Sequence, residues 1–147
     1  MIDFLRSLLA APAAPAQAPD AALAVAALLV EAARADADYT QAEAVTITRF
    51  LAEMFGLDPA AAAAARAAGE TAQANAADLV RFTRVVKTEL APHERVALIE
   101  ALWRVVVSDG RRDPHEDALL RKLAPLIAVT DRESAEARRR VTGPAGG

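Results

Sequence analysis

The stretch Ser-Asp-Gly-Arg-Arg-Asp-Pro-His-Glu, residues 108–116, repeats the polar pattern of the earlier stretch Ala-Asp-Ala-Asp-Tyr-Thr-Gln-Ala-Glu, residues 35–43. In each copy the second residue is Asp and the last is Glu. We call residues 35–43 the first acidic turn and residues 108–116 the second acidic turn. Each one follows an apolar run with helical spacing and precedes another. The sequence therefore predicts an internally duplicated helix-turn-helix unit.

Helix capping accounts for part of each acidic turn. Thr40 and Asp113 are good N-cap residues, and Glu43 and Glu116 follow them with the spacing of a capping box. Each cap is worth about 1 kcal/mol. Capping alone therefore explains these four residues without a ligand.

Capping does not explain Asp36 and Asp109, which are expected at the C-terminal ends of the preceding helices. The helix dipole disfavours a negative charge there by roughly 0.3–1 kcal/mol. A nearby cation would offset this cost, and the candidates are Arg34, Arg111, Arg112 or a divalent ion. Carboxylates are hard oxygen ligands, which suit calcium or magnesium better than zinc. The predicted metal ligands are Asp36, Asp38, Glu43, Asp109, Asp113 and Glu116.

The acidic turns differ from an EF-hand loop, which has a longer spacing and a central Gly. Three carboxylates per turn also fall short of the about six to eight oxygens that calcium takes. Backbone carbonyls, water or both turns together would have to complete the site. Arg111 and Arg112 add positive charge that works against a cation at the second turn.

Composition indicates a single helical domain. A chain of 147 residues buries roughly two-thirds of its unfolded surface on folding. Ala is abundant, aromatic residues make up 4%, and no segment alternates with the period of a strand.

The net charge of −3 argues against nucleic-acid binding. The absence of Cys excludes disulfides and thiolate sites and is typical of a reducing, cytoplasmic location.

Apolar spacing predicts an all-α fold, a compact bundle of about seven helices. The first helix is apolar on most sides and is expected at the centre. The third is rich in Ala and is expected to be exposed or thinly packed. Asp20, Asp58 and Asp131 are expected caps, and Pro125 is expected to bend or end its helix. The predicted helices cover about residues 20–34, 44–54 with Gly56 as the end, 59–68 with Gly69 as the end, 75–90, 92–106, 119–127 and 131–140.

Residues 1–19 are expected to stand outside the domain at residues 20–141, which a tail at residues 142–147 follows. They would form a short amphipathic helix and a linker rich in Pro and Ala. No secretory signal is expected, because charged residues interrupt the early apolar run. The apolar stripe is predicted either to pack on the chain's own domain or to dock on a partner or membrane surface. That stripe consists of Phe4, Leu5, Leu8 and Leu9.

Two Pro-His-Glu triplets, residues 92–94 and 114–116, do not form a zinc-protease site. Such a site needs a second His one helical turn later, where the sequence has Ala97 and Leu119. The sequence also lacks a Gly-rich phosphate loop and a nucleophile elbow. It therefore indicates no catalytic centre, and an acid–base hydrolase built on the carboxylates is the most distant alternative.

Three longer stretches, together with the acidic turns, indicate a resemblance to a known protein family. They are Phe-Gly-Leu-Asp-Pro at residues 55–59, Leu-Val-Arg-Phe-Thr-Arg at residues 79–84, and Glu-Arg-Val-Ala-Leu-Ile-Glu-Ala-Leu-Trp-Arg-Val at residues 94–105. Over about residues 20–140 the chain resembles the TerB-like family associated with tellurite resistance. The resemblance implies a compact helical domain with internal duplication, no established enzymatic activity, and acidic turns that bind divalent metal.

The resemblance carries metal ligation to Asp36, Glu43, Asp109 and Glu116, with Asp38 and Asp113 as helpers. Ala37 stands where the second turn has Gly110, and Arg111 stands opposite Asp38, so the two turns are not expected to bind equally. The leading prediction is a non-enzymatic module that binds a divalent cation or a protein partner in a stress-response assembly. The alternative is a purely structural interaction module whose acidic turns are helix caps.

Overall fold

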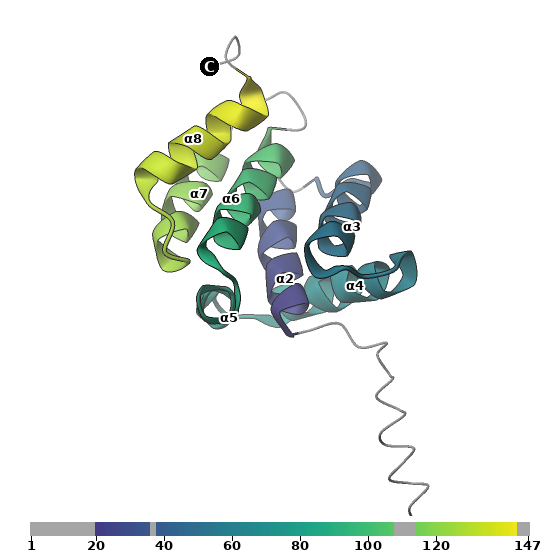
Figure 1. Ribbon diagram of the computed structural model, residues 1–147. Helices are drawn as coiled ribbons and strands as arrows, with labels where there is room; N and C mark the ends of the chain where they lie inside the picture. Colours follow the sequence, from purple (N-terminus) through teal and green to yellow (C-terminus); the bar gives the residue numbers. More distant parts are fainter. Residues whose placement is uncertain (1–19, 36–37, 108–113, 144–147) are drawn as a thin grey trace, which may run out of the picture.

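A computed structural model describes residues 20–35, 38–107 and 114–143, with the backbone alone for residues 114–116. Within these ranges the chain forms seven α-helices and no strand, so the predicted all-α bundle is confirmed. Figure 1 shows the helices arranged around α2, with α3 and α4 on one side and α6, α7 and α8 on the other. The bounds are α2 Asp20–Arg34, α3 Gln41–Phe55, α4 Pro59–Asn75, α5 Val80–Glu89, α6 Pro92–Val106, α7 Pro114–Leu126 and α8 Asp131–Thr142.

Helix α2 lies at the centre because it is apolar on every side. Eleven of its fifteen residues are buried, and α3, α4, α5 and α6 all pack against it. Its many Ala side chains let these neighbours approach closely, while Val25, Leu28 and Leu29 fill the space between them. The expectation of a central first helix is confirmed.

Helix α3 begins and ends at residues with identifiable local causes. Thr40 is its N-cap and forms a capping box with Glu43, as predicted. Gly56 ends the helix at a φ of 62°, in the left-handed region that glycine adopts without steric cost. Ile47 and Leu51 are fully buried and face the core.

Helix α4 departs from the sequence prediction. It begins as expected, with Asp58 as N-cap, but it continues through Gly69 to Asn75 and packs against α2 more extensively than any other described helix does. A Cβ atom at Gly69 would lie 2.5 Å from the Cβ of Ala26, closer than two carbon atoms can approach. The predicted end at Gly69 was wrong, because this glycine marks close contact with α2. The expectation of an exposed or thinly packed helix holds outside the contact face, since only Ala62, Ala65 and Gly69 of the helix are buried.

Helix α5 begins at Val80, later than the predicted start near Asn75. Asn75 is instead the last residue of α4, and residues 76–79 connect the two helices. Asp78 then marks the new start, since its Oδ1 accepts a hydrogen bond of 2.9 Å from the backbone N–H of Val80. Phe82 and Val86 bury the predicted apolar face of the helix.

Helices α6, α7 and α8 form the remaining layer. Pro92 opens α6 as predicted, and Pro125 lies in the last turn of α7. The N-cap of α8 is Thr130, whose hydroxyl accepts from the backbone of Glu133, so the assignment of that cap to Asp131 was wrong by one residue. Among the described helices, none is long and apolar enough to cross a membrane.

Candidate functional site

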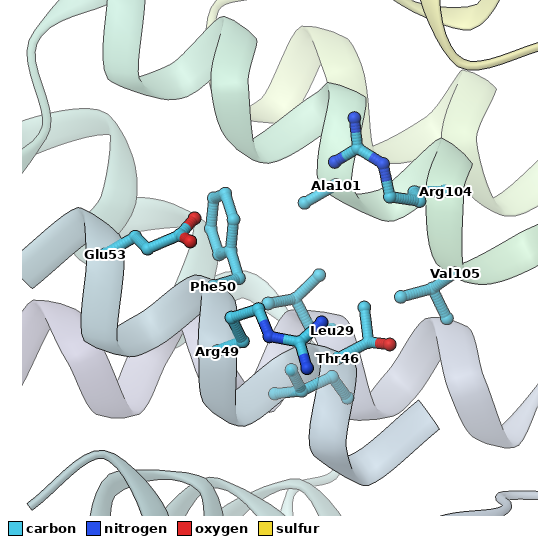
Figure 2. Close-up of a pocket in the computed structure, with 9 residues that line it drawn as sticks. Leu29, Thr46, Arg49, Phe50, Glu53, Ala101, Arg104 and Val105 are labelled. Atoms are coloured by element: carbon cyan, nitrogen blue, oxygen red, sulfur yellow. The ribbon is translucent and has the colours of Figure 1, made fainter. Parts of the chain in front are cut away.

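Both acidic turns connect helices that meet at one end of the bundle. The first joins α2 to α3, and the second joins α6 to α7. In Figure 1 the end of α2, the start of α3 and the end of α6 all lie toward the top. Helix α2 packs on α6, and Thr46 near the start of α3 lines the same groove as Val105 near the end of α6 (Figure 2). The described helix ends beside the two turns, namely those of α2, α3 and α6, therefore lie at the same end of the bundle.

The side chains of most of the predicted metal ligands fall outside the described part of the structure. Of the remaining two, Asp38 is exposed and Glu43 is buried. Among the described residues no group of three or more acidic or His side chains lies close enough to hold a metal ion. Metal ligation therefore stays a prediction. The four candidates whose side chains are not described are Asp36, Asp109, Asp113 and Glu116.

Glu43 has a local structural role at the first acidic turn. Its Oε1 accepts a hydrogen bond of 2.8 Å from the backbone N–H of Thr40. In return, the hydroxyl of Thr40 accepts one of 3.1 Å from the backbone N–H of Glu43. Two N–H groups that the helix start would leave unpaired are thereby satisfied.

Tyr39 links the first acidic turn to the middle of α4. Its hydroxyl donates a hydrogen bond of 2.6 Å to Oε2 of Glu70, and Nη1 of Arg66 donates to the same oxygen at 2.6 Å. Nε of Arg66 donates to the hydroxyl of Thr48 on α3 at 2.8 Å. We call these four residues the Tyr39 network. It joins the turn, α3 and α4 in one set of hydrogen bonds.

The network fixes the charge states of its members. Burial, together with the hydrogen bond to the Glu70 carboxylate, raises the pKa of Tyr39 from 10.0 to about 12. Burial opposes ionisation of Glu70, but the hydrogen bonds from Tyr39 and Arg66 outweigh it and lower the pKa of that carboxyl. At neutral pH a neutral phenol therefore donates to an ionised carboxylate.

Arg34, at the end of α2, is directed toward α4. Its guanidinium lies 5.5 Å from the centre of the Tyr39 ring, and Nη1 donates to the backbone carbonyl of Glu70 at 3.4 Å and to Oε1 of Gln73. Nε2 of Gln73 in turn donates to Oε1 of Glu31 at 2.7 Å. The cation that the sequence offered as a partner for Asp36 is thus engaged by groups on α4 and by Tyr39.

The Tyr39 network was not predicted from the sequence. Arg66 and Glu70 have the one-turn spacing of a helical ion pair, and that signal was available. Nothing local relates Tyr39 to Glu70, because the contact depends on how α4 crosses the end of α2. His93 is exposed on the first turn of α6, as expected for a surface residue, whereas the side chain of His115 is not described.

One of three comparisons with known proteins gave a match. The profile of the family described as tellurite resistance protein TerB matches residues 22–139, which contain nearly all of the described bundle. Searches among curated proteins and among solved structures gave no match. The profile covers most of the chain and includes both acidic turns. The chain therefore belongs to the TerB family.

Proposed function

We propose that the chain is a binding module of the tellurite-resistance type, which holds a divalent cation through carboxylates of its two acidic turns. One observation carries the proposal: the end of α2, the start of α3 and the end of α6, which flank the two turns, lie toward one end of the bundle (Figure 1), and these three helices pack on one another. Neither turn alone offers enough oxygens for such an ion. Carboxylates from both turns would share one site or form two adjacent sites.

The chemistry of the donors favours calcium or magnesium over zinc. All six candidate side chains are carboxylates, which are hard oxygen ligands, and the chain contains no Cys. Asp38 is exposed at the first turn, where water can complete a coordination shell. One carboxylate oxygen of Glu43 already accepts a hydrogen bond from the backbone N–H of Thr40. A cation would therefore have to share this side chain with the helix cap.

Helix dipoles affect the carboxylates at the start and at the end of a turn differently. Glu43 lies in the first turn of α3, where the dipole favours a carboxylate. Asp36 and Asp109 follow the C-terminal ends of α2 and α6, where the dipole disfavours one. Nη1 of Arg34 donates to groups on α4, and its guanidinium lies over the Tyr39 ring, so we propose an external cation as a further source of compensating charge for Asp36.

The second candidate function is a purely structural interaction module in a stress-response assembly. The capping box of Thr40 and Glu43 supports it, because this box gives the most conspicuous acidic residue of the first turn a role that needs no ligand. In that case the acidic turns are helix caps, and binding to a protein partner is the function. Both candidates describe binding rather than catalysis.

Thermal unfolding with and without added calcium, magnesium, manganese or zinc separates these candidates. A cation at one hundred times its Kd adds about 2.7 kcal/mol, which raises the Tm by roughly 5–10 °C for a domain of this size. The double variant Asp36→Asn with Asp109→Asn should lose this gain. The control Asp20→Asn with Asp131→Asn has the same net charge and should keep it. No gain for the natural chain with any cation would exclude the metal site.

A further inference from the structure

A groove lies between α3 and α6, above α2. It has a volume of about 120 Å³, and Leu29 of α2 and Ile47 of α3, both buried, form its floor. Figure 2 shows the ring of Phe50 on one wall and the guanidinium groups of Arg49 and Arg104 on opposite sides of the opening. The groove exists because α3 and α6 both pack on α2 but contact each other only briefly.

The charges around the groove are unevenly paired. Arg49 is exposed and forms no salt bridge with any described residue. Nη2 of Arg104 lies 3.3 Å from Oε1 of Glu100, but Nε of Arg140 occupies the other oxygen of that carboxylate at 2.6 Å. One carboxylate is therefore shared between two guanidinium groups. The charged residues that line the groove are Arg49, Arg104 and Glu53, so on a chain with a net charge of −3 the groove has a net positive lining.

We propose that this groove docks a segment of a protein partner that presents a large apolar side chain flanked by carboxylates. The volume suits one such side chain, and the two arginines suit acidic neighbours. The groove residues on α3 run from Thr46 to Glu53, about two helical turns or roughly 10 Å. A short amphipathic helix of the partner matches that length.

The charges also discriminate against other occupants. The chain's own apolar stripe, Phe4, Leu5, Leu8 and Leu9, has one Asp and one Arg near it, at positions 3 and 6, and so offers no net negative charge to the arginines. Glu53 lies beside Phe50 at one end of the groove in Figure 2. A bound acidic segment is therefore expected to place its carboxylates toward the arginines and away from Glu53. The groove does not depend on the acidic turns binding a cation.

Binding of a fluorescein-labelled helical peptide tests the proposal. The probe carries Leu and Phe one helical turn apart with Glu at the flanking positions, and the control peptide carries Lys in place of Glu. We expect the acidic probe to bind the full chain and to shift the amide NMR signals of residues 46–53 and 101–105. Arg49→Gln with Arg104→Gln should weaken binding about fivefold to tenfold, as two rim ion pairs are lost.

Matched variants make the result decisive. Arg121→Gln with Arg139→Gln removes the same charge from exposed positions on α7 and α8 and should change the affinity less than about twofold. Leu5→Glu with Leu8→Glu should leave the affinity unchanged. An equal loss in both arginine pairs, a lysine probe that binds as well, shifts outside the groove, or no binding would overturn the proposal. A large gain in affinity from the Leu5 and Leu8 changes would show that the chain's own stripe occupies the groove, and would overturn it too.

Discussion

The hydroxyl of Tyr39 donates a 2.6 Å hydrogen bond to the Glu70 carboxylate, which ties the residues just before α3 to the middle of α4. The same carboxylate oxygen accepts from Arg66, so one anion holds two donors from different parts of the chain. This contact joins Tyr39 to a helix that the sequence did not suggest as its neighbour. It therefore links the residue before the N-cap of α3 to α4.

Titration of Tyr39 should show this contact directly, because it is the only tyrosine in the chain. Its pKa is raised from 10.0 to about 12, so tyrosinate absorbance should appear well above pH 10 in the folded protein and near pH 10 in denaturant. The raised pKa contributes stability that is complete below pH 10 and is lost as the pH rises toward 12. A folded midpoint near pH 10 would contradict the contact.

Glu70→Gln should destabilise the domain in a way that depends on pH. The pKa of Glu70 is lowered, so its contribution to stability is present above the ordinary value of 4.5 and is lost as the pH falls through the folded pKa. We expect a loss of about 1–3 kcal/mol at neutral pH by urea denaturation. The loss should shrink in acid. Glu89→Gln, at an exposed position, is the control, and an equal effect there would refute the assignment.

Gly69→Ala should destabilise the domain although Ala favours helix. The added Cβ would meet the Cβ of Ala26 at 2.5 Å and the backbone N of Ala27 at 2.9 Å. Overpacking costs about 1–3 kcal/mol, which outweighs a propensity gain of about 1 kcal/mol. Ala26→Gly in the same chain should restore part of the loss. A stabilised Gly69→Ala variant in chemical denaturation would mean that α2 and α4 do not pack this closely.

Ser134→Ala should cost more than a surface change on α8. The indole N–H of Trp103 donates to the hydroxyl of Ser134 at 3.1 Å, and both residues are buried. Without that acceptor the buried indole N–H is left unpaired, which costs about 1–3 kcal/mol of stability. Ala135→Ser, at an exposed position next to it, should be nearly neutral. The fluorescence of Trp103, the only tryptophan, reports both unfolding transitions.

Local signals predicted the helices, and long-range packing accounts for the errors. Thr40, Gly56 and Pro92 determine helix ends through their own backbones and side chains, so the sequence located them correctly. Gly69 was misread because a glycine in an Ala-rich segment is equally consistent with a helix end and with a close helix crossing. Only the position of Ala26 distinguishes the two.

The candidate site also combines features that local sequence predicts with features that depend on long-range packing. The capping box of Thr40 and Glu43 is local, and it was predicted and confirmed. The Tyr39 network depends on the crossing of α2 and α4, so no spacing in the sequence could reveal it. Ligation by Asp36 and Asp109 stays a prediction, because it depends on how two separate turns approach each other. The ends of α2, α3 and α6 beside those turns lie at one end of the bundle, so their signals can be used to test whether a cation binds there.

Paramagnetic broadening of amide NMR signals by added manganese tests the central claim most directly. A cation bound between the acidic turns should first broaden the signals of Arg34, Gln41 and Val106, the described residues next to those turns. Ala22 and His93 lie at the opposite ends of α2 and α6, roughly 20 Å away, and should stay sharp at the same manganese concentration. Uniform broadening, or broadening centred elsewhere, would contradict cation binding by the acidic turns.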